Sequence, residues 1–93
     1  MEFIELFNGV VKLAKPVSAE TAYAKSLDDK IKDLGIDSLD TIMISMYFSE
    51  IYGIEDDIMR EMKVETIGDL QAFLEANKTR IPADNKTELA RVK

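Results

Sequence analysis

Ser38 is the residue whose type and surroundings most directly suggest chemistry. It lies in the segment Asp33-Leu34-Gly35-Ile36-Asp37-Ser38-Leu39-Asp40, just before an apolar stretch that ends at Tyr52. A serine in this position places its hydroxyl at the start of a helix, where backbone N–H groups point outward and the helix dipole favours an anion. The sequence therefore predicts an exposed hydroxyl that can carry a phosphate group.

The same residues also have a purely structural interpretation. Asp37 or Ser38 can serve as the N-cap of the helix, and Gly35 can supply a turn with positive φ. Asp40 is an acid in the first turn, where it complements the helix dipole. Spacing alone favours this interpretation, because Ser and Asp rank among the best N-cap residues.

The heptapeptide Leu34-Gly35-Ile36-Asp37-Ser38-Leu39-Asp40 resembles the prosthetic-group attachment motif of acyl carrier proteins. In that family the Ser of an Asp-Ser-Leu triplet receives 4'-phosphopantetheine from coenzyme A, and Ser38 is the matching position. The resemblance implies that a phosphopantetheinyl transferase supplies the base and Mg²⁺ and that the terminal thiol of the arm holds acyl groups as thioesters. It also implies an all-α fold, a small four-helix bundle with a long first loop and a short third helix.

Other chemistries lack the residues that they need. The chain has no Cys and no His, so a thiolate nucleophile, a nucleophilic triad and the usual zinc ligands are missing. An EF-hand loop with Gly35 at its sixth position would need acids in place of Lys30, Lys32 and Leu34, and no P-loop pattern occurs. We therefore expect no catalytic or metal-binding residue, and we interpret the protein as a carrier and a substrate of the transferase, not as an enzyme.

Hydrophobic periodicity predicts the first two helices of such a bundle. Apolar residues recur at helical spacing up to Ala14, before Pro16, which predicts a helix over about residues 2–14. Residues 17–26 are interpreted as loop. Ser26-Leu27-Asp28-Asp29 fits a capping pattern for a short helical segment before Gly35, about one turn more than the family usually has there. The second helix is expected over about residues 39–52, with Gly53 as its stop.

The second half of the chain predicts two more helices. A short one follows the acidic segment at residues 54–57, and a last one runs from Thr66, its N-cap, to about Asn77. The resemblance implies that the acyl chain enters a cleft beside the second and third helices. The candidate pocket residues are apolar: Ile44, Phe48, Ile54, Met59, Met62, Ile67 and Leu70. We expect one helical domain over residues 1–77 and a polar, basic, flexible tail over residues 78–93.

Acidic residues surround Ser38. The net charge of the chain is −6, and residues 28–57 alone contain nine acidic and two basic residues. This pattern disfavours nucleic-acid binding and favours protein partners with basic docking patches. The resemblance implies that these partners are acyl-loading and acyl-using enzymes. The second helix has fewer acids than is common in the family, which favours a more apolar partner. We assign partner recognition to a set of acidic and apolar residues: Asp37, Leu39, Asp40, Met43, Met46, Glu50, Glu55 and Asp56.

Two alternative functions remain open at this point. An aminoacyl or peptidyl carrier of nonribosomal synthesis would use the same Ser and bundle, whereas the acidic surroundings favour an acyl carrier of a fatty-acid, polyketide or related pathway. The second alternative is an unmodified helical adaptor that presents Met and Tyr side chains to a protein partner. No apolar stretch is long enough to span a membrane, and the N-terminal segment lacks a basic flank, so we expect a cytoplasmic protein. We also expect a monomer.

Overall fold

The helices lie close to where hydrophobic periodicity predicts them. A computed structural model describes residues 3–15 and 23–92, and these residues contain five α-helices, one short 3₁₀ helix and no strand. The elements in chain order are α1 (Phe3–Ala14), η2 (Ile31–Leu34), α2 (Ser38–Tyr52), α3 (Asp56–Arg60), α4 (Ile67–Asn77) and α5 (Asn85–Val92). The all-α prediction is confirmed, and helices α1 to α4 correspond to the four predicted helices.

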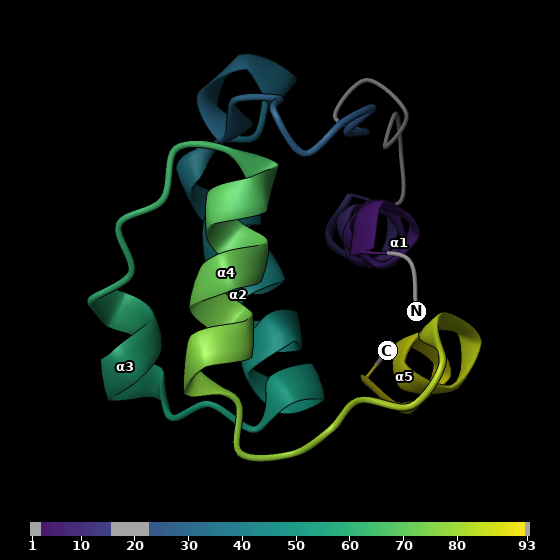
Figure 1. The fold of residues 1–93 in the computed structure, drawn as a ribbon. Helices are drawn as coiled ribbons and strands as arrows, with labels where there is room; N and C mark the ends of the chain where they lie inside the picture. Colours follow the sequence, from purple (N-terminus) through teal and green to yellow (C-terminus); the bar gives the residue numbers. More distant parts are fainter. Residues whose placement is uncertain (1–2, 16–22, 93) are drawn as a thin grey trace.

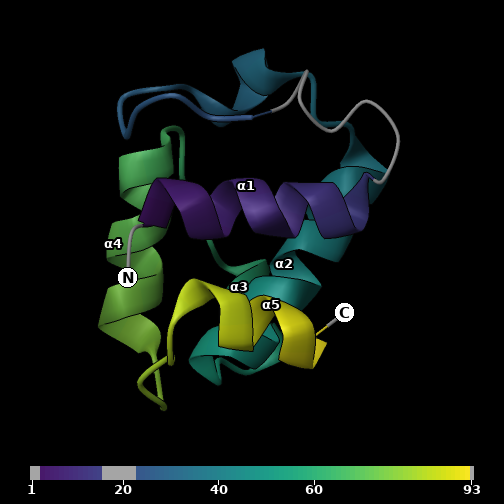
Figure 2. The ribbon, with the colours of Figure 1, turned by 90° about the vertical axis from the view of Figure 1, so that its right-hand side faces the viewer.

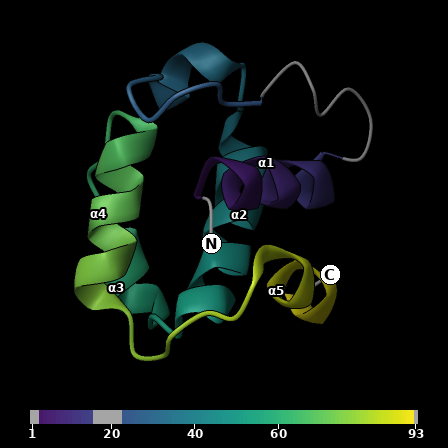
Figure 3. The same ribbon diagram turned by 45° about the vertical axis from the view of Figure 1, so that its right-hand side comes forward.

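Helices α2 and α4 lie side by side and begin at the same end of the molecule (Figure 1). Helix α1 runs across them (Figure 2). Helix α3 contacts α2 and lies on the side away from α1 (Figure 1). Helix α5 packs against α1 and α2 (Figure 3). The segment that contains η2 covers the end of the bundle at which α2 begins (Figure 1).

Helix α1 supplies one wall of the core because its apolar residues share one face. The buried residues recur every three or four positions, as a helical repeat of 3.6 residues requires. They are Phe3, Leu6, Phe7, Val10, Val11 and Ala14. The helix ends at Ala14, as predicted. Pro16 and loop residues 17–22 lie outside the described residues, so the structure of this part of the long first loop stays a prediction.

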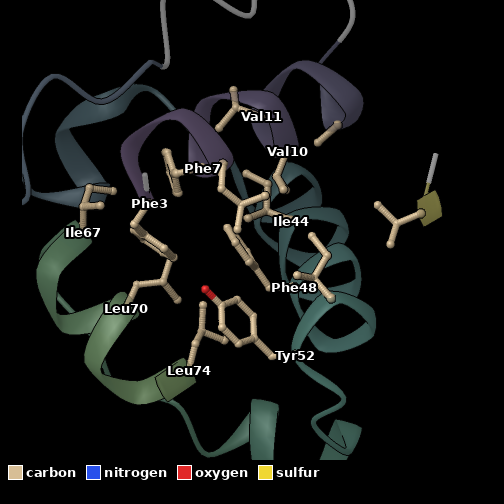
Figure 4. Close-up of a cluster of buried hydrophobic side chains, with 14 of the residues drawn as sticks. Phe3, Phe7, Val10, Val11, Ile44, Phe48, Tyr52, Ile67, Leu70 and Leu74 are labelled. Atoms are coloured by element: carbon tan, nitrogen blue, oxygen red, sulfur yellow. The ribbon is translucent and has the colours of Figure 1, made fainter. Parts of the chain in front are cut away.

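The core is centred on Phe48 of α2, which is fully buried. Its ring stacks on those of Phe3 and Phe7 of α1, with centroid distances of 5.7 and 6.3 Å, and lies 6.3 Å from the ring of Tyr52 (Figure 4). Such aromatic pairs contribute about 0.5–1.5 kcal/mol each beyond the burial of their area. Phe48 therefore joins α1 to α2. Burial also raises the pKa of Tyr52 from 10 to about 12.

Helix α4 begins with a complete capping box. The Thr66 hydroxyl accepts a hydrogen bond from the Asp69 N–H at 3.0 Å, and the Asp69 carboxylate accepts one from the Thr66 N–H at 3.2 Å. The hydrogen bonds from the backbone N–H groups of Thr66 and Glu65 lower the pKa of Asp69. The predicted cap at Thr66 and the predicted end at Asn77 are confirmed.

The predicted helix start at Ser26 is a turn in the structure. The Asp29 carboxylate accepts hydrogen bonds from the N–H groups of Lys25 and Ser26 at 2.6 and 3.2 Å. The chain then pairs with the segment before α4, since the Ile31 N–H donates to the Glu65 carbonyl at 2.8 Å. The helical segment begins only at Ile31, as the 3₁₀ helix η2. Pairing with a distant segment therefore shortened the helix that the local pattern predicts.

The C-terminal segment differs from the flexible tail that its polar composition predicts. Residues 85–92 form α5, and Glu88 of this helix is buried. Its carboxylate pairs with Arg80 at 2.9 Å and Arg91 at 3.1 Å, and it accepts a hydrogen bond from the Ala83 N–H at 2.8 Å. The hydrogen bond from Arg80, followed by those from Ala83 and Arg91, lowers the pKa of Glu88 to about 2. A network of charged groups, together with Val92 and Leu89 that pack against the core, thus holds this segment in place.

The same segment satisfies the carbonyl groups at the end of α2, which have no donor within the helix. The side chains of Arg91 and Arg80 donate hydrogen bonds to the backbone oxygens of Glu50 (2.8 Å) and Ile51 (2.6 Å), respectively. The Thr79 N–H donates to the Tyr52 oxygen at 2.9 Å, and the Thr79 hydroxyl donates to the Gly53 oxygen. We call Thr79, Arg80, Glu88 and Arg91 the C-terminal clasp. Gly53 ends α2 with a φ of 67°, as predicted.

Candidate functional site

Ser38 is the first residue of α2, and its side chain is exposed. Asp37 is the N-cap, because its carboxylate accepts a hydrogen bond from the Asp40 N–H at 2.8 Å. The N–H groups of the first helical turn lack acceptors within the helix, so those of Ser38 and Leu39 are available to a ligand. The structure therefore presents the Ser38 hydroxyl at the partly positive end of a well-capped helix.

An apolar cleft of about 240 Å³ opens beside α2. Its lining residues come from four α-helices, from η2 and from the segments before α2 and α4: Phe7, Ile31, Ile36, Thr41, Ile44, Ser45, Phe48, Met59, Met62, Lys63, Val64 and Leu70. Thr41 follows Ser38 by three residues, so the two lie one turn apart on neighbouring positions of the helix surface. The cleft therefore reaches the turn of α2 that follows Ser38.

The cleft contains most of the apolar pocket residues proposed from the sequence: Ile44, Phe48, Met59, Met62 and Leu70. Ile54 and Ile67 are buried in the core and do not line the cleft. Sequence reasoning missed Ile31, Ile36 and Val64, which form another wall. The bridge between Lys30 and Thr66 brings their segments together. No local pattern signals this pairing.

Two further hollows border the apolar cleft. One, of about 380 Å³, is more polar, because Lys30, Lys32 and Glu65 lie beside the apolar residues that it shares with the cleft. The other, of about 430 Å³, is an outer groove between α2 and α3 and is lined by Thr41, Ile42, Ser45, Met46, Asp56, Met59 and Arg60. Thr41, Ser45 and Met59 line both the cleft and the outer groove. These three residues therefore form the ridge between the two hollows.

The exposed face of α2 is apolar. Leu39, Ile42 and Met46 are 66%, 61% and 54% exposed and follow one another three and four residues apart, so they share one face of the helix. Met43 is half-buried, and Glu50 is exposed one turn after Met46. Ile42 is missing from the recognition residues proposed from the sequence. The signal for it was the excess of apolar residues on α2, more than one core-facing stripe can hold.

The acidic residues proposed for partner recognition differ in how far they are exposed to solvent. Asp37, Glu55 and Asp56 are exposed, although Asp37 also caps α2. Asp40 is 8% exposed, and its carboxylate pairs with the Lys15 ammonium at 3.2 Å, just after α1. A cation beyond the end of one helix and an anion in the first turn of the next both complement the helix dipoles. Asp40 therefore joins α1 to α2 and is less exposed than the other proposed acids, and its role in partner recognition stays a prediction.

Two other kinds of site are absent from the described residues. Residues 3–15 and 23–92 contain no group of three or more His, Cys, Asp or Glu side chains placed to hold a metal ion. In the same part of the chain, no helix combines the length and the apolar character that a membrane span requires.

Curated proteins with similar sequences are named acyl carrier protein. That of Helicobacter pylori (strain G27) is 30% identical over 66 residues, which are 71% of this chain and 85% of that protein. That of Prochlorococcus marinus (strain MIT 9515) is 35% identical over 66 residues, 71% of this chain and 82% of that protein. That of Helicobacter acinonychis (strain Sheeba) is 40% identical over 48 residues, 52% of this chain and 62% of that protein.

No protein-family model matches the chain, and no solved structure gives a significant match. The curated relatives nevertheless cover most of it, and its described residues form the helical fold that the Asp-Ser-Leu motif implies. This chain belongs to the acyl carrier protein family.

Proposed function

We propose that Ser38 bears 4'-phosphopantetheine and that the protein passes acyl groups between enzymes of a fatty-acid, polyketide or related acyl-transfer pathway. The observation that carries this proposal is the exposed Ser38 at the start of α2, one turn before an apolar cleft. When bound, the arm supplies a thiol that holds acyl groups as thioesters. The chain has no Cys of its own, so that thiol is the only one on the protein.

The residues around Ser38 fit a phosphate group. The N–H groups at the start of α2 and the helix dipole favour an anion there. Asp40, the acid two residues after Ser38, is paired with Lys15, which reduces the repulsion that an added phosphate meets. Asp37 uses its carboxylate to cap the helix and so keeps the first turn in place. These features support Ser38 as the attachment residue.

Ser38 acts as an acceptor in this modification. Its oxygen forms a bond to the phosphorus that carries pantetheine in coenzyme A, adenosine 3',5'-bisphosphate leaves, and the hydroxyl proton passes to the transferase. The chain has no His that would activate Ser38, so the base and Mg²⁺ come from the transferase. On this proposal the protein is a carrier and a substrate.

The cleft suits the storage of an acyl chain, and the exposed face of α2 suits the docking of enzymes; both are tasks of a carrier. Apolar walls at Phe7, Phe48 and Leu70 favour an acyl chain, since each buried methylene contributes about 0.8 kcal/mol. The docking surface that we propose for acyl-handling enzymes consists of an apolar face with exposed acids nearby: Asp37, Leu39, Ile42, Met43, Met46, Glu50, Glu55 and Asp56. The cytoplasmic location and the monomeric state stay predictions.

The modification is tested by intact mass. The folded protein is incubated with coenzyme A, Mg²⁺ and a broad-specificity phosphopantetheinyl transferase. Wild type and Ser49→Ala should each gain one phosphopantetheine unit, and Ser38→Ala should gain none. A gain that persists in Ser38→Ala would place the attachment elsewhere, and no gain in folded wild type would favour the adaptor. Loading the modified protein with acyl or with aminoacyl groups separates the two classes of carrier.

A further inference from the structure

Ser45 lies on the same stripe of α2 as Ser38. The two residues are seven positions apart, which is almost two full turns, so their side chains point in nearly the same direction and are about 10 Å apart along the helix. Ser45 lies on the ridge between the apolar cleft and the outer groove and lines both hollows. A flexible group attached to Ser38 passes Ser45 whichever of these two hollows it follows.

The hydroxyl of Ser45 is available to a ligand. Within the described part of the chain it makes no hydrogen bond, whereas the nearby hydroxyls of α2 are engaged. The Thr41 hydroxyl donates to the Asp37 carbonyl at 2.9 Å, and the Ser49 hydroxyl donates to the Met46 carbonyl at 2.7 Å. Most of the cleft wall around Ser45 is apolar. A polar group that lies there therefore gains a hydrogen-bond partner at this hydroxyl.

We infer that the Ser45 hydroxyl binds an amide group of the arm carried by Ser38, an inference that rests on the proposed function. Pantetheine contains two amide groups between its phosphate and its thiol, and each amide offers a donor and an acceptor. An extended chain advances roughly 1.2 Å per bond, so about 10 Å corresponds to roughly eight bonds from Ser38. The part of the arm at this distance from Ser38 lies between the two amides, well before the thiol.

Ser45 thereby sets the path of the arm. A hydrogen bond at this hydroxyl holds the middle of the arm against α2 and directs the thiol end past Met59, which lines both hollows and is almost fully buried. The thiol is then partly shielded from solvent even when it carries no acyl group. Loss of the Ser45 hydroxyl releases the arm and exposes the thiol.

Thiol reactivity tests the inference without any acyl-transfer enzyme. The chain has no Cys, so a disulfide reagent such as 5,5'-dithiobis(2-nitrobenzoate) reacts with the arm alone. Each variant is modified, its mass gain is verified, and its rate of reaction is measured. We expect Ser45→Ala to react about threefold to tenfold faster than wild type, the range that one hydrogen bond allows. Ser45→Thr, which keeps the hydroxyl, should react like wild type.

Ser49→Ala is the matched control, because Ser49 lies one turn further along α2 and its hydroxyl is already bonded to the helix backbone. Its rate should equal that of wild type. Equal rates for wild type and Ser45→Ala overturn the inference, and so does an equal increase in Ser49→Ala, which indicates general loosening of α2. Wild type that gains no arm overturns the proposed function and this inference together, and the mass measurement distinguishes that failure from the others.

Discussion

At its first residue α2 presents an exposed serine and outward N–H groups, whereas at its other end donors reach each carbonyl oxygen from Ser49 to Gly53. The open end is held by the carboxylate cap of Asp37 and by the ion pair between Asp40 and Lys15. The anchored end is held by the C-terminal clasp, whose residues lie 26 to 41 positions away in sequence. The comparison suggests that firm anchoring at one end of a helix allows the other end to stay accessible for chemistry.

Removal of the Glu88 charge should weaken the anchored end most. Glu88→Gln leaves Arg80 and Arg91 without their shared anion, so we expect the free energy of unfolding to fall by about 2 kcal/mol. Glu75→Gln is the control, because its pair with Lys78 is far more exposed than Glu88 and contributes less than about 1 kcal/mol. Urea denaturation measures both. A similar loss in the two variants would contradict a special role for the clasp.

Acid should have the same effect on the anchored end as the substitution. The pKa of Glu88 is lowered from 4.5 to about 2, chiefly by the hydrogen bond from Arg80. Because the pKa in the folded state lies below the unfolded value, this stabilisation is complete above pH 4.5 and is lost as the pH falls toward 2.

The stability difference between wild type and Glu88→Gln should therefore shrink over this range when urea denaturation is repeated at decreasing pH. Asp29, Asp69 and Asp84 also have lowered pKa values, but they are present in both proteins and cancel in the difference. A difference that does not change with pH would contradict the assignment.

Loss of the cap at the open end should lower the free energy of unfolding less than loss of the Glu88 charge does. Asp37→Ala leaves the Asp40 N–H without its acceptor and should lower the free energy of unfolding by about 1 kcal/mol. Asp37→Ser keeps a capping oxygen and should recover most of this loss. Because both variants remove the charge, both should raise the KM of the transferase if Asp37 also orients the encounter. Stability that Ser fails to restore would contradict the capping role.

Substitutions on the exposed face of α2 should affect stability least. Ile42→Gln and Met46→Gln change side chains that are more than half exposed, so we expect changes below about 0.5 kcal/mol. The KM of an acyl-loading enzyme should nevertheless rise several-fold. Ile81→Gln is the matched control, because Ile81 is 83% exposed and lies outside α2. An equal KM for all three variants would contradict the proposed docking surface.

Features that depend on neighbouring residues could be predicted from the sequence. The cap at Thr66, the left-handed glycine after α2 and the buried face of α1 each follow from residue types within one or two turns. The position of Ser38 at a helix start is equally local. Such signals also placed five of the seven proposed apolar residues in the cleft.

Features that depend on distant partners could not be predicted in this way. Asp40 has the sequence position of an exposed first-turn acid, but in the structure it is buried and paired with Lys15, 25 residues away. Helix α5 has few apolar residues, and its Glu88 is buried between two arginines while Val92 and Leu89 pack against the core. A periodicity pattern contains no information about either contact, because neither is made by apolar residues on one face.

Because the carbonyl groups at the end of α2 are all hydrogen-bonded, local unfolding of this helix should start at its N-terminal end. Fraying of a helix begins where few hydrogen bonds must break, and in α2 that place is the exposed pair Ser38 and Leu39, which precede the ion pair between Asp40 and Lys15. The last turn opens only together with the clasp and with the packing of Phe48 and Tyr52. Ser38 and Leu39 can therefore leave the helix and return to it while the rest of the bundle, including the ion pair between Lys15 and Asp40, stays folded.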